Sequence, residues 1–108
     1  MVDPMELSPN RPGTVDVSID GGVAVLTLRG CLDAATGRVM ADAAYSLAAD
    51  DLVRLDVDLR HITAFDQAGA EALLACRDAG AALEEGLHYR TGQGPGRAAL
   101  LAAYRRGD

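Results

Sequence analysis

The chain has 108 residues, which is the size of one domain built around one core. Acidic residues outnumber basic ones to give a formal net charge of −6, and Arg supplies all of the permanent positive charge. An acidic surface does not track phosphate groups, so this balance argues against a nucleic-acid partner. The sequence also lacks an apolar run of about twenty residues, so we expect a cytoplasmic protein without membrane insertion.

The N-terminal part of the chain divides into an arm and a predicted hairpin. Residues 1–13 are rich in proline and too polar to order themselves, so we expect a flexible arm ahead of a single domain over 14–108. Apolar and polar residues alternate over Thr14–Ile19, and a second strand is predicted over Val23–Arg29. The Asp-Gly-Gly turn between them favours a tight antiparallel pairing of these strands.

A strand, helix and strand unit follows the hairpin. The apolar spacing over Ala34–Ala49 predicts a helix, with Asp33 as its N-cap. Leu52–Leu59 alternates cleanly, so one face of this strand is expected in the core and the other in solvent, where Asp56 and Asp58 lie. A helix that joins two strands in this way implies a parallel crossover.

The remaining elements repeat this order. The segment His61–Ala70 is interpreted as a loop that leads from the end of that strand into a helix over Gln67–Glu85. A short strand over Leu87–Arg90 and a final helix over Pro95–Arg106 complete the pattern. Strands that alternate are covered on one face only. The sequence therefore predicts the α/β class, with a mixed β-sheet and helices packed on one face of it.

The most informative part of the sequence is the predicted helix start at Asp66. Its carboxylate can accept hydrogen bonds from the free amides of the first turn, and Phe65 can pack back onto the helix. Gly69 lies inside that turn although glycine lowers helicity, which indicates a close approach by another backbone or by a partner. An ordinary helix N-terminus without a binding role stays an alternative, because such caps are common.

Two segments resemble the STAS domain, the fold of bacterial anti-sigma factor antagonists. In that family a strand leads to Asp-Ser-Ser-Gly or Asp-Ser/Thr-x-Gly at a helix start, where this chain has Asp-Gln-Ala-Gly at 66–69. The segment Val25–Thr36, with Gly-Cys-Leu-Asp at 30–33, is similar to the family's strand, Gly-x-Leu-Asp and helix. The resemblance extends from Thr14 to Arg106 and preserves the order of the elements, although a fold alone does not settle a function.

The resemblance implies a binding module in transcription regulation. In the family, a serine-kinase-type anti-sigma factor phosphorylates the acceptor hydroxyl, and the added charge disrupts binding. Gln67 stands at that position without a hydroxyl, which implies constitutive binding, and Thr63 does not match the acceptor position. The implied partner-binding residues are Asp33, Thr36, Phe65, Asp66, Gln67, Ala68 and Gly69.

Other roles stay open within this resemblance. Single STAS domains also serve as cytoplasmic subunits of lipid-transport ABC systems, and some carry Ala at the position of Ala68. A degenerate STAS scaffold that has lost its partner would show the same substitution at Gln67. The family usually continues past the last helix into another strand, which implies an open sheet edge beside Leu87–Arg90 and a homodimer formed there.

The remaining reactive residues form no recognisable catalytic or metal-binding pattern. His61 and His88 have no Cys and carboxylate partners at ligand spacing, so we expect no metal. The glycine-rich segment Thr91–Gly96 lacks the lysine of a P-loop, so we expect no nucleotide and no other cofactor. Cys31 and Cys76 are expected to be free thiols. The sequence therefore predicts a protein that is not an enzyme.

Overall fold

A computed structural model describes residues 13–107 of the chain, so the predicted N-terminal arm lies outside the described residues except for Gly13. The described part alternates strands and helices around one sheet. In chain order the elements are β1 (Thr14–Asp20), β2 (Val23–Leu32), α2 (Ala34–Ala48), β3 (Arg54–Phe65), α3 (Gln67–Gly80), β4 (Leu87–Arg90) and α4 (Pro95–Gly107).

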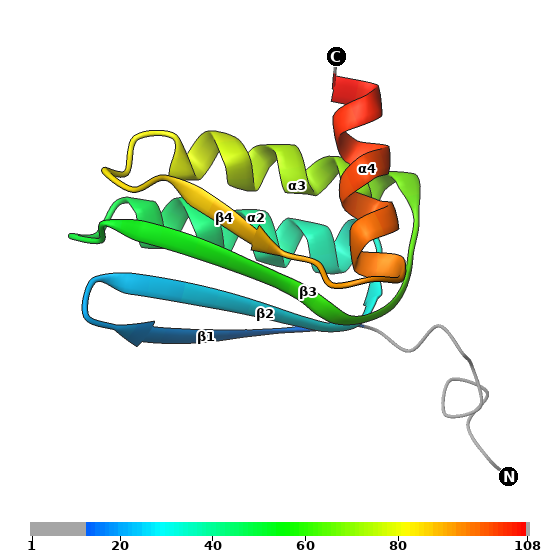
Figure 1. Ribbon diagram of the computed structural model, residues 1–108, viewed down its shortest axis with the longest axis horizontal. Helices are drawn as coiled ribbons and strands as arrows, with labels where there is room; N and C mark the ends of the chain where they lie inside the picture. Colours follow the sequence, from blue (N-terminus) through cyan, green and yellow to red (C-terminus); the bar gives the residue numbers. More distant parts are fainter. Residues whose placement is uncertain (1–12, 108) are drawn as a thin grey trace, which may run out of the picture.

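The strands form one four-stranded mixed sheet in the order β1-β2-β3-β4 (Figure 1). β1 and β2 are antiparallel, whereas β2 pairs with β3, and β3 with β4, in parallel. Gly21 and Gly22 form the hairpin turn with φ values of 59° and 84°, a backbone conformation that suits glycine at both positions. The predicted hairpin and the parallel crossovers are therefore confirmed.

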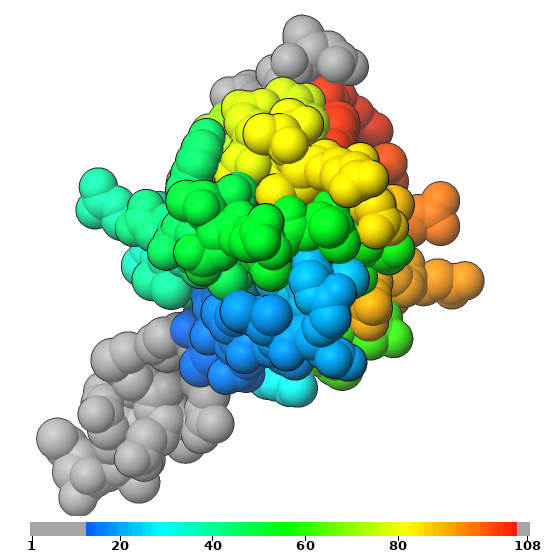
Figure 2. Space-filling model, turned by 90° about the vertical axis from the view of Figure 1, so that its left-hand side faces the viewer, coloured from blue at the N-terminus to red at the C-terminus, as the bar shows by residue number. Residues whose placement is uncertain are grey.

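The helices α2 and α3 lie side by side on one face of the sheet, and α4 packs across α3 and the end of β3 (Figure 1). The apolar residues of the strands point toward these helices, because side chains of a strand alternate between its faces. Figure 2 shows the end of the molecule that carries the β1–β2 turn, in blue, and the α3–β4 loop, in yellow. The core is mostly aliphatic, and its largest fully buried apolar side chains are Leu26, Leu28, Leu32, Met40, Leu55, Val57, Leu59 and Leu73.

Several predicted boundaries were wrong. β2 ends at Leu32 rather than at Arg29, and β3 begins at Arg54 rather than at Leu52. β3 does not end before His61 but continues to Phe65, so no loop precedes α3. Register shifts near Gly30, where φ is 82°, allow β2 and β3 to keep pairing over this extra length. Helix α3 ends at Gly80 rather than at Glu85, because the chain turns there to bring β4 back to the sheet.

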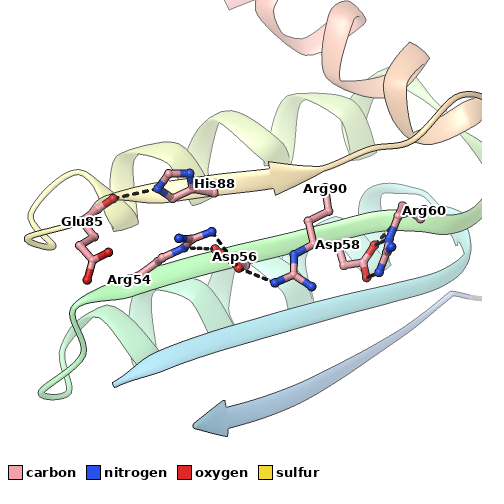
Figure 3. Close-up of polar contacts among 7 residues, drawn as sticks. All are labelled: Arg54, Asp56, Asp58, Arg60, Glu85, His88 and Arg90. Atoms are coloured by element: carbon pink, nitrogen blue, oxygen red, sulfur yellow. Dashed lines mark hydrogen bonds and ion pairs between the residues drawn. The ribbon is translucent and has the colours of Figure 1, made fainter. Parts of the chain in front are cut away.

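The prediction that Asp56 and Asp58 lie on a solvated face was also wrong. Only 1% of Asp56 and 4% of Asp58 is exposed. Both point to the face without helices, where arginine side chains lie over them (Figure 3). Asp56 accepts from Arg54 at 2.7 Å and from Arg90 at 2.9 Å, and Asp58 accepts from Arg60 at 2.8 and 2.9 Å. Each buried carboxylate is thus paired, as burial of a charge requires.

Candidate functional site

The two helices on the sheet begin in the same way. The carboxylate of Asp33 accepts a hydrogen bond from the Thr36 N–H at 2.8 Å, and that of Asp66 accepts from the Gly69 N–H at 2.8 Å. Both aspartates have extended backbone angles and stand one residue before their helix. Each therefore satisfies an amide of the first turn that has no partner within the helix, which confirms both predicted N-caps.

The two helix starts touch each other through backbone. The Asp66 N–H donates to the Leu32 carbonyl at 3.2 Å, and Gly69 packs so closely on the same carbonyl that a Cβ there would overlap the oxygen. Gly37 of α2 faces Ala72 of α3, where an added Cβ would lie 2.8 Å from the Ala72 Cβ. The predicted close approach at Gly69 is confirmed, and the approaching backbone belongs to this chain.

The predicted site residues separate into exposed and buried groups. Thr36 and Gly69 are buried and support the two helix starts. The others reach the surface at the same end of the molecule, beyond the carboxyl ends of β2 and β3, and we call them the junction patch. It consists of the half-buried Asp33 and Phe65 and the exposed Asp66, Gln67 and Ala68.

Gln67 occupies the outer side of the first turn of α3. Its side-chain amide donates to a carboxylate oxygen of Glu71 at 3.3 Å, and this contact lies at the surface. The sequence interpretation missed Glu71, although the spacing of four residues on a helix was a signal for such a pair. The position that would hold the family's phosphate group is therefore next to a carboxylate in this chain.

The junction patch is acidic. The pKa of Asp33 is lowered, mainly because its carboxylate accepts a hydrogen bond from the Thr36 N–H, so Asp33 is ionised at neutral pH. The pKa of the Cys31 thiol is raised by burial and by the negative charges of Asp33 and Asp66. The Cys31 thiol therefore stays protonated at neutral pH. The junction patch therefore presents negative charge at the surface.

A shallow apolar hollow adjoins the patch between β1 and α2. Its volume is about 160 Å³, and it is lined by Gly13, Val15, Asp33, Ala35, Thr36 and Val39. The sequence interpretation did not predict it, because the hollow depends on how far α2 extends over the edge of the sheet. It offers space for an apolar side chain beside the Asp33 carboxylate.

The chemistry of the other reactive groups is limited. Among residues 13–107, no cluster of three or more His, Cys, Asp or Glu side chains has a geometry that could hold a metal ion. Burial raises the pKa of the Cys76 thiol to about 12, so Cys76 is a packing residue rather than a nucleophile. Cys31 and Cys76 are both free. Within the described range, none of the helices has the length and apolar character needed to span a membrane.

Comparison with known families and structures agrees with this geometry. The family model described as "Mlab, STAS domain" matches residues 15–107. The chain therefore belongs to the STAS-domain family.

Solved structures give the same fold. An anti-sigma factor antagonist from Mycobacterium paratuberculosis matches with a TM-score of 0.69 and 22% identity, over 99% of this chain and 86% of that one. The anti-sigma factor antagonist SpoIIAA in its unphosphorylated form matches with a TM-score of 0.65 and 13% identity, over 82% of each chain. A search of curated proteins finds no match.

Proposed function

We propose that this STAS domain is a protein-binding regulatory module of the anti-sigma factor antagonist type, and that the junction patch binds a serine-kinase-type anti-sigma factor. The observation that carries the proposal is the exposed, neutral Gln67 on the first turn of α3, next to the Asp33 helix start. The fold shared with two anti-sigma factor antagonists supports it. The role is binding without catalysis, in the cytoplasm where such a partner acts.

The mechanism follows from mass action. A module that binds the anti-sigma factor removes it from its sigma factor, and the extent of release depends on the concentration of the module. A phosphate at the helix start would add about −1.5 to −2 charges and abolish this contact. Gln67 cannot accept a phosphate, so the binding is constitutive, and regulation depends on abundance or on a competing partner.

The chemistry of the patch defines the partner surface. Asp33 and Asp66 supply negative charge, whereas Phe65 and the adjoining hollow supply apolar surface. A complementary partner presents a basic side chain with an apolar neighbour that fills the hollow. Such pairing of opposite potentials sets the specificity and the association rate of a complex.

A second candidate function is a subunit of a lipid-transport ABC system. The observation that favours it is the family model itself, which carries the description "Mlab, STAS domain". The same patch would then contact a nucleotide-binding ATPase instead of an anti-sigma factor. A degenerate scaffold without a partner is the remaining alternative, and it predicts no specific capture by this patch.

Substitution of Gln67 tests the proposal. Gln67→Glu places a permanent anion where the family's phosphate acts, and we expect it to weaken binding of the anti-sigma factor by about 2 kcal/mol or more. Gln67→Ala removes the amide without adding charge and should weaken binding less. Ala82→Glu is the matched control, because Ala82 is exposed in the turn after α3, at the far end from the patch.

The measurement is isothermal titration with the purified anti-sigma kinase and, in parallel, with the ABC ATPase. Tight binding to the kinase that only the Gln67 variants reduce supports the first function, whereas binding to the ATPase alone supports the second. If Gln67→Glu binds the kinase as tightly as the unmodified chain, the junction patch is not the interface.

Phosphorylation provides an independent check on the mechanism. Incubation with the kinase and ATP should leave the intact mass of the chain unchanged, whereas Gln67→Ser should gain one phosphate. A phosphate on any residue from Ile62 to Gly69 of the unmodified chain contradicts constitutive binding. Mass spectrometry of the intact protein distinguishes these results.

A further inference from the structure

The edge strand β1 carries few of the features that usually protect the edge of a sheet, because its two acids, Asp16 and Asp20, lie on the face without helices. It has seven residues, and its register with β2 is uninterrupted from Thr14 to Asp20. It contains neither proline nor lysine, and its helix-facing side carries Val17 and Ile19, which are 49% and 56% exposed. Natural proteins normally shorten, charge or distort such a strand, because its free N–H and C=O groups can pair with another chain.

The hairpin geometry identifies the backbone groups of β1 that point away from β2 and have no partner among residues 13–107. In a two-residue hairpin with positive φ at both turn residues, the flanking pair, here Asp20 and Val23, is hydrogen-bonded. The pattern alternates along an antiparallel pair. Val15, Val17 and Ile19 therefore direct their N–H and C=O groups away from β2, and the same residues direct their apolar side chains toward the helix layer.

We propose that a second copy of this chain pairs with β1 in antiparallel orientation, with Val17 opposite Val17 of the second copy. Val15 then lies opposite Ile19, and the outward backbone groups of the two strands are mutually satisfied. The two sheets join into one, with the helices of both copies on the same face. The apolar side chains of the two β1 strands become neighbours. This contact lowers the exposed fractions of Val17 and Ile19.

Charge selects this register over its neighbours. On the face without helices, the proposed pairing sets Asp16 opposite Ser18 and Asp20 opposite Thr14, so no acid faces an acid. A shift by two residues sets Asp16 opposite Asp16 in one direction and Asp16 opposite Asp20 in the other. Like charges directly opposite each other destabilise a strand pair, so only the register centred on Val17 uses the full strand without repulsion.

The other edge of the sheet is a poorer surface for pairing. β4 has only four residues. Its residues His88 and Arg90, on the face without helices, carry polar or charged groups. Tyr89 turns inward, where its hydroxyl donates to the Leu73 carbonyl at 2.8 Å and its ring packs edge-on against Tyr104 of α4. We therefore place self-association at β1 and not beside β4.

The proposed dimer leaves both junction patches accessible. The patch lies at the Thr14 end of β1, because Thr14 pairs with Arg29 near the end of β2. The antiparallel pairing places the Thr14 end of one copy beside the Asp20 end of the other, so the two patches are separated by more than the length of β1, which is about 20 Å. The dimer therefore presents two separate binding surfaces and can engage a dimeric partner with avidity.

Sedimentation equilibrium of the purified full chain over a range of concentrations tests the proposal without any partner. We expect a reversible monomer–dimer equilibrium. Val17→Lys places like charges opposite each other at the two-fold axis and should raise the dissociation constant at least about tenfold. Val17→Glu should do the same, and an equimolar mixture of the two variants should restore the dimer as a heterodimer. His88→Lys is the matched control on β4 and should leave the dimer unchanged.

Disulfide formation tests the register. Hydrogen-bonded pairs in antiparallel strands have Cα atoms about 5.5 Å apart, within the range that a disulfide spans. On oxidation, Val17→Cys should form a covalent dimer, whereas Val15→Cys alone should not, and Val15→Cys mixed with Ile19→Cys should cross-link. Circular dichroism confirms that the variants stay folded. A chain that stays monomeric at high micromolar concentration, or a dimer that His88→Lys disrupts and Val17→Lys does not, overturns the proposal.

Discussion

The helix starts at Asp33 and Asp66 have the same local hydrogen bonds but different surroundings. In each, an aspartate accepts from the amide three residues later at 2.8 Å. At the third helical position, however, α2 has Thr36, whereas α3 has Gly69 pressed against the Leu32 carbonyl. The N-cap hydrogen bond alone therefore does not distinguish the start of α3 from the start of α2. The contact with Leu32 holds the start of α3 against the end of β2, and it allows no side chain at Gly69.

The largest effect is expected from a substitution that breaks the contact between Gly69 and the Leu32 carbonyl. Gly69→Ala forces a Cβ into the Leu32 carbonyl, so the backbone of α3 or β2 must move, and we expect a loss of about 3 kcal/mol in the free energy of unfolding. Thr36→Ala is the control at the same position of α2, and it should cost about 1 kcal/mol because it removes a buried methyl group and the hydroxyl that hydrogen-bonds the Asp33 carboxylate. Urea denaturation measures both. Equal losses for the two variants would mean that the two helix starts are equivalent.

A carboxylate outside both helix starts contributes to the acid stability. The bidentate hydrogen bond from Arg60 lowers the pKa of the buried Asp58 from 3.8 to about 2. Because the folded pKa is depressed, the stabilisation is complete above pH 3.8 and is lost as the pH falls toward 2. We expect about 2 kcal/mol to disappear over this window. Denaturation as a function of pH should show a shallower acid limb for Asp58→Asn, and a smaller change for Asp33→Asn.

Removal of the caps should affect both helices alike. Asp33→Ala and Asp66→Ala each leave one buried or half-buried amide without its acceptor, at a cost of about 1 kcal/mol. Asn at either position keeps a side-chain oxygen and should recover most of the loss. The melting temperatures of the four variants provide the measurement. A cost at Asp66 that is several times the cost at Asp33 would show that the Leu32 contact depends on the cap.

The smallest expected effect concerns the first residues of α2 and α3. Ala34 has Arg38 four residues later, whereas Gln67 has Glu71. An acid is favourable by about 0.3 to 1 kcal/mol at a helix N-terminus, and a pair at this spacing adds or subtracts about 0.2 to 0.5 kcal/mol.

Ala34→Glu should therefore raise the melting temperature, while Gln67→Glu should change it very little. High salt should reduce the difference between the two variants, because both terms are screened. A large loss of stability in Gln67→Glu would mean that weakened partner binding by this variant reflects unfolding and not charge at the interface.

Most of the fold was predictable because its signals are local. The alternation in β1 and the Gly21-Gly22 turn predicted the hairpin, and Asp33 and Asp66 predicted the helix starts, with the first residue of each helix correct. The extension of β3 to Phe65 was not predictable in this way. It depends on the register shifts near Gly30, which let β2 continue beside it.

The candidate site was predictable only in its residue types. Asp66, Gln67 and Ala68 are exposed as a binding role requires, but the burial of Thr36 and Gly69 follows from packing between α2 and the neighbouring segments. Glu71 was missed although the spacing of four residues was visible. No local sequence pattern predicts the hollow beside Asp33. Its lining residues come from β1 and α2, which are separated in the sequence by β2.

The sequence by itself determined the order of the elements and where each helix begins, because capping and turn-forming hydrogen bonds join residues only a few positions apart. The tertiary structure alone decided which distant atoms meet, as in the contact of Gly69 with the Leu32 carbonyl and in the 2.9 Å pair of Arg90 with Asp56, 34 residues away. These contacts depend on strand register, and a slip of one residue would turn every side chain of a strand to the opposite face.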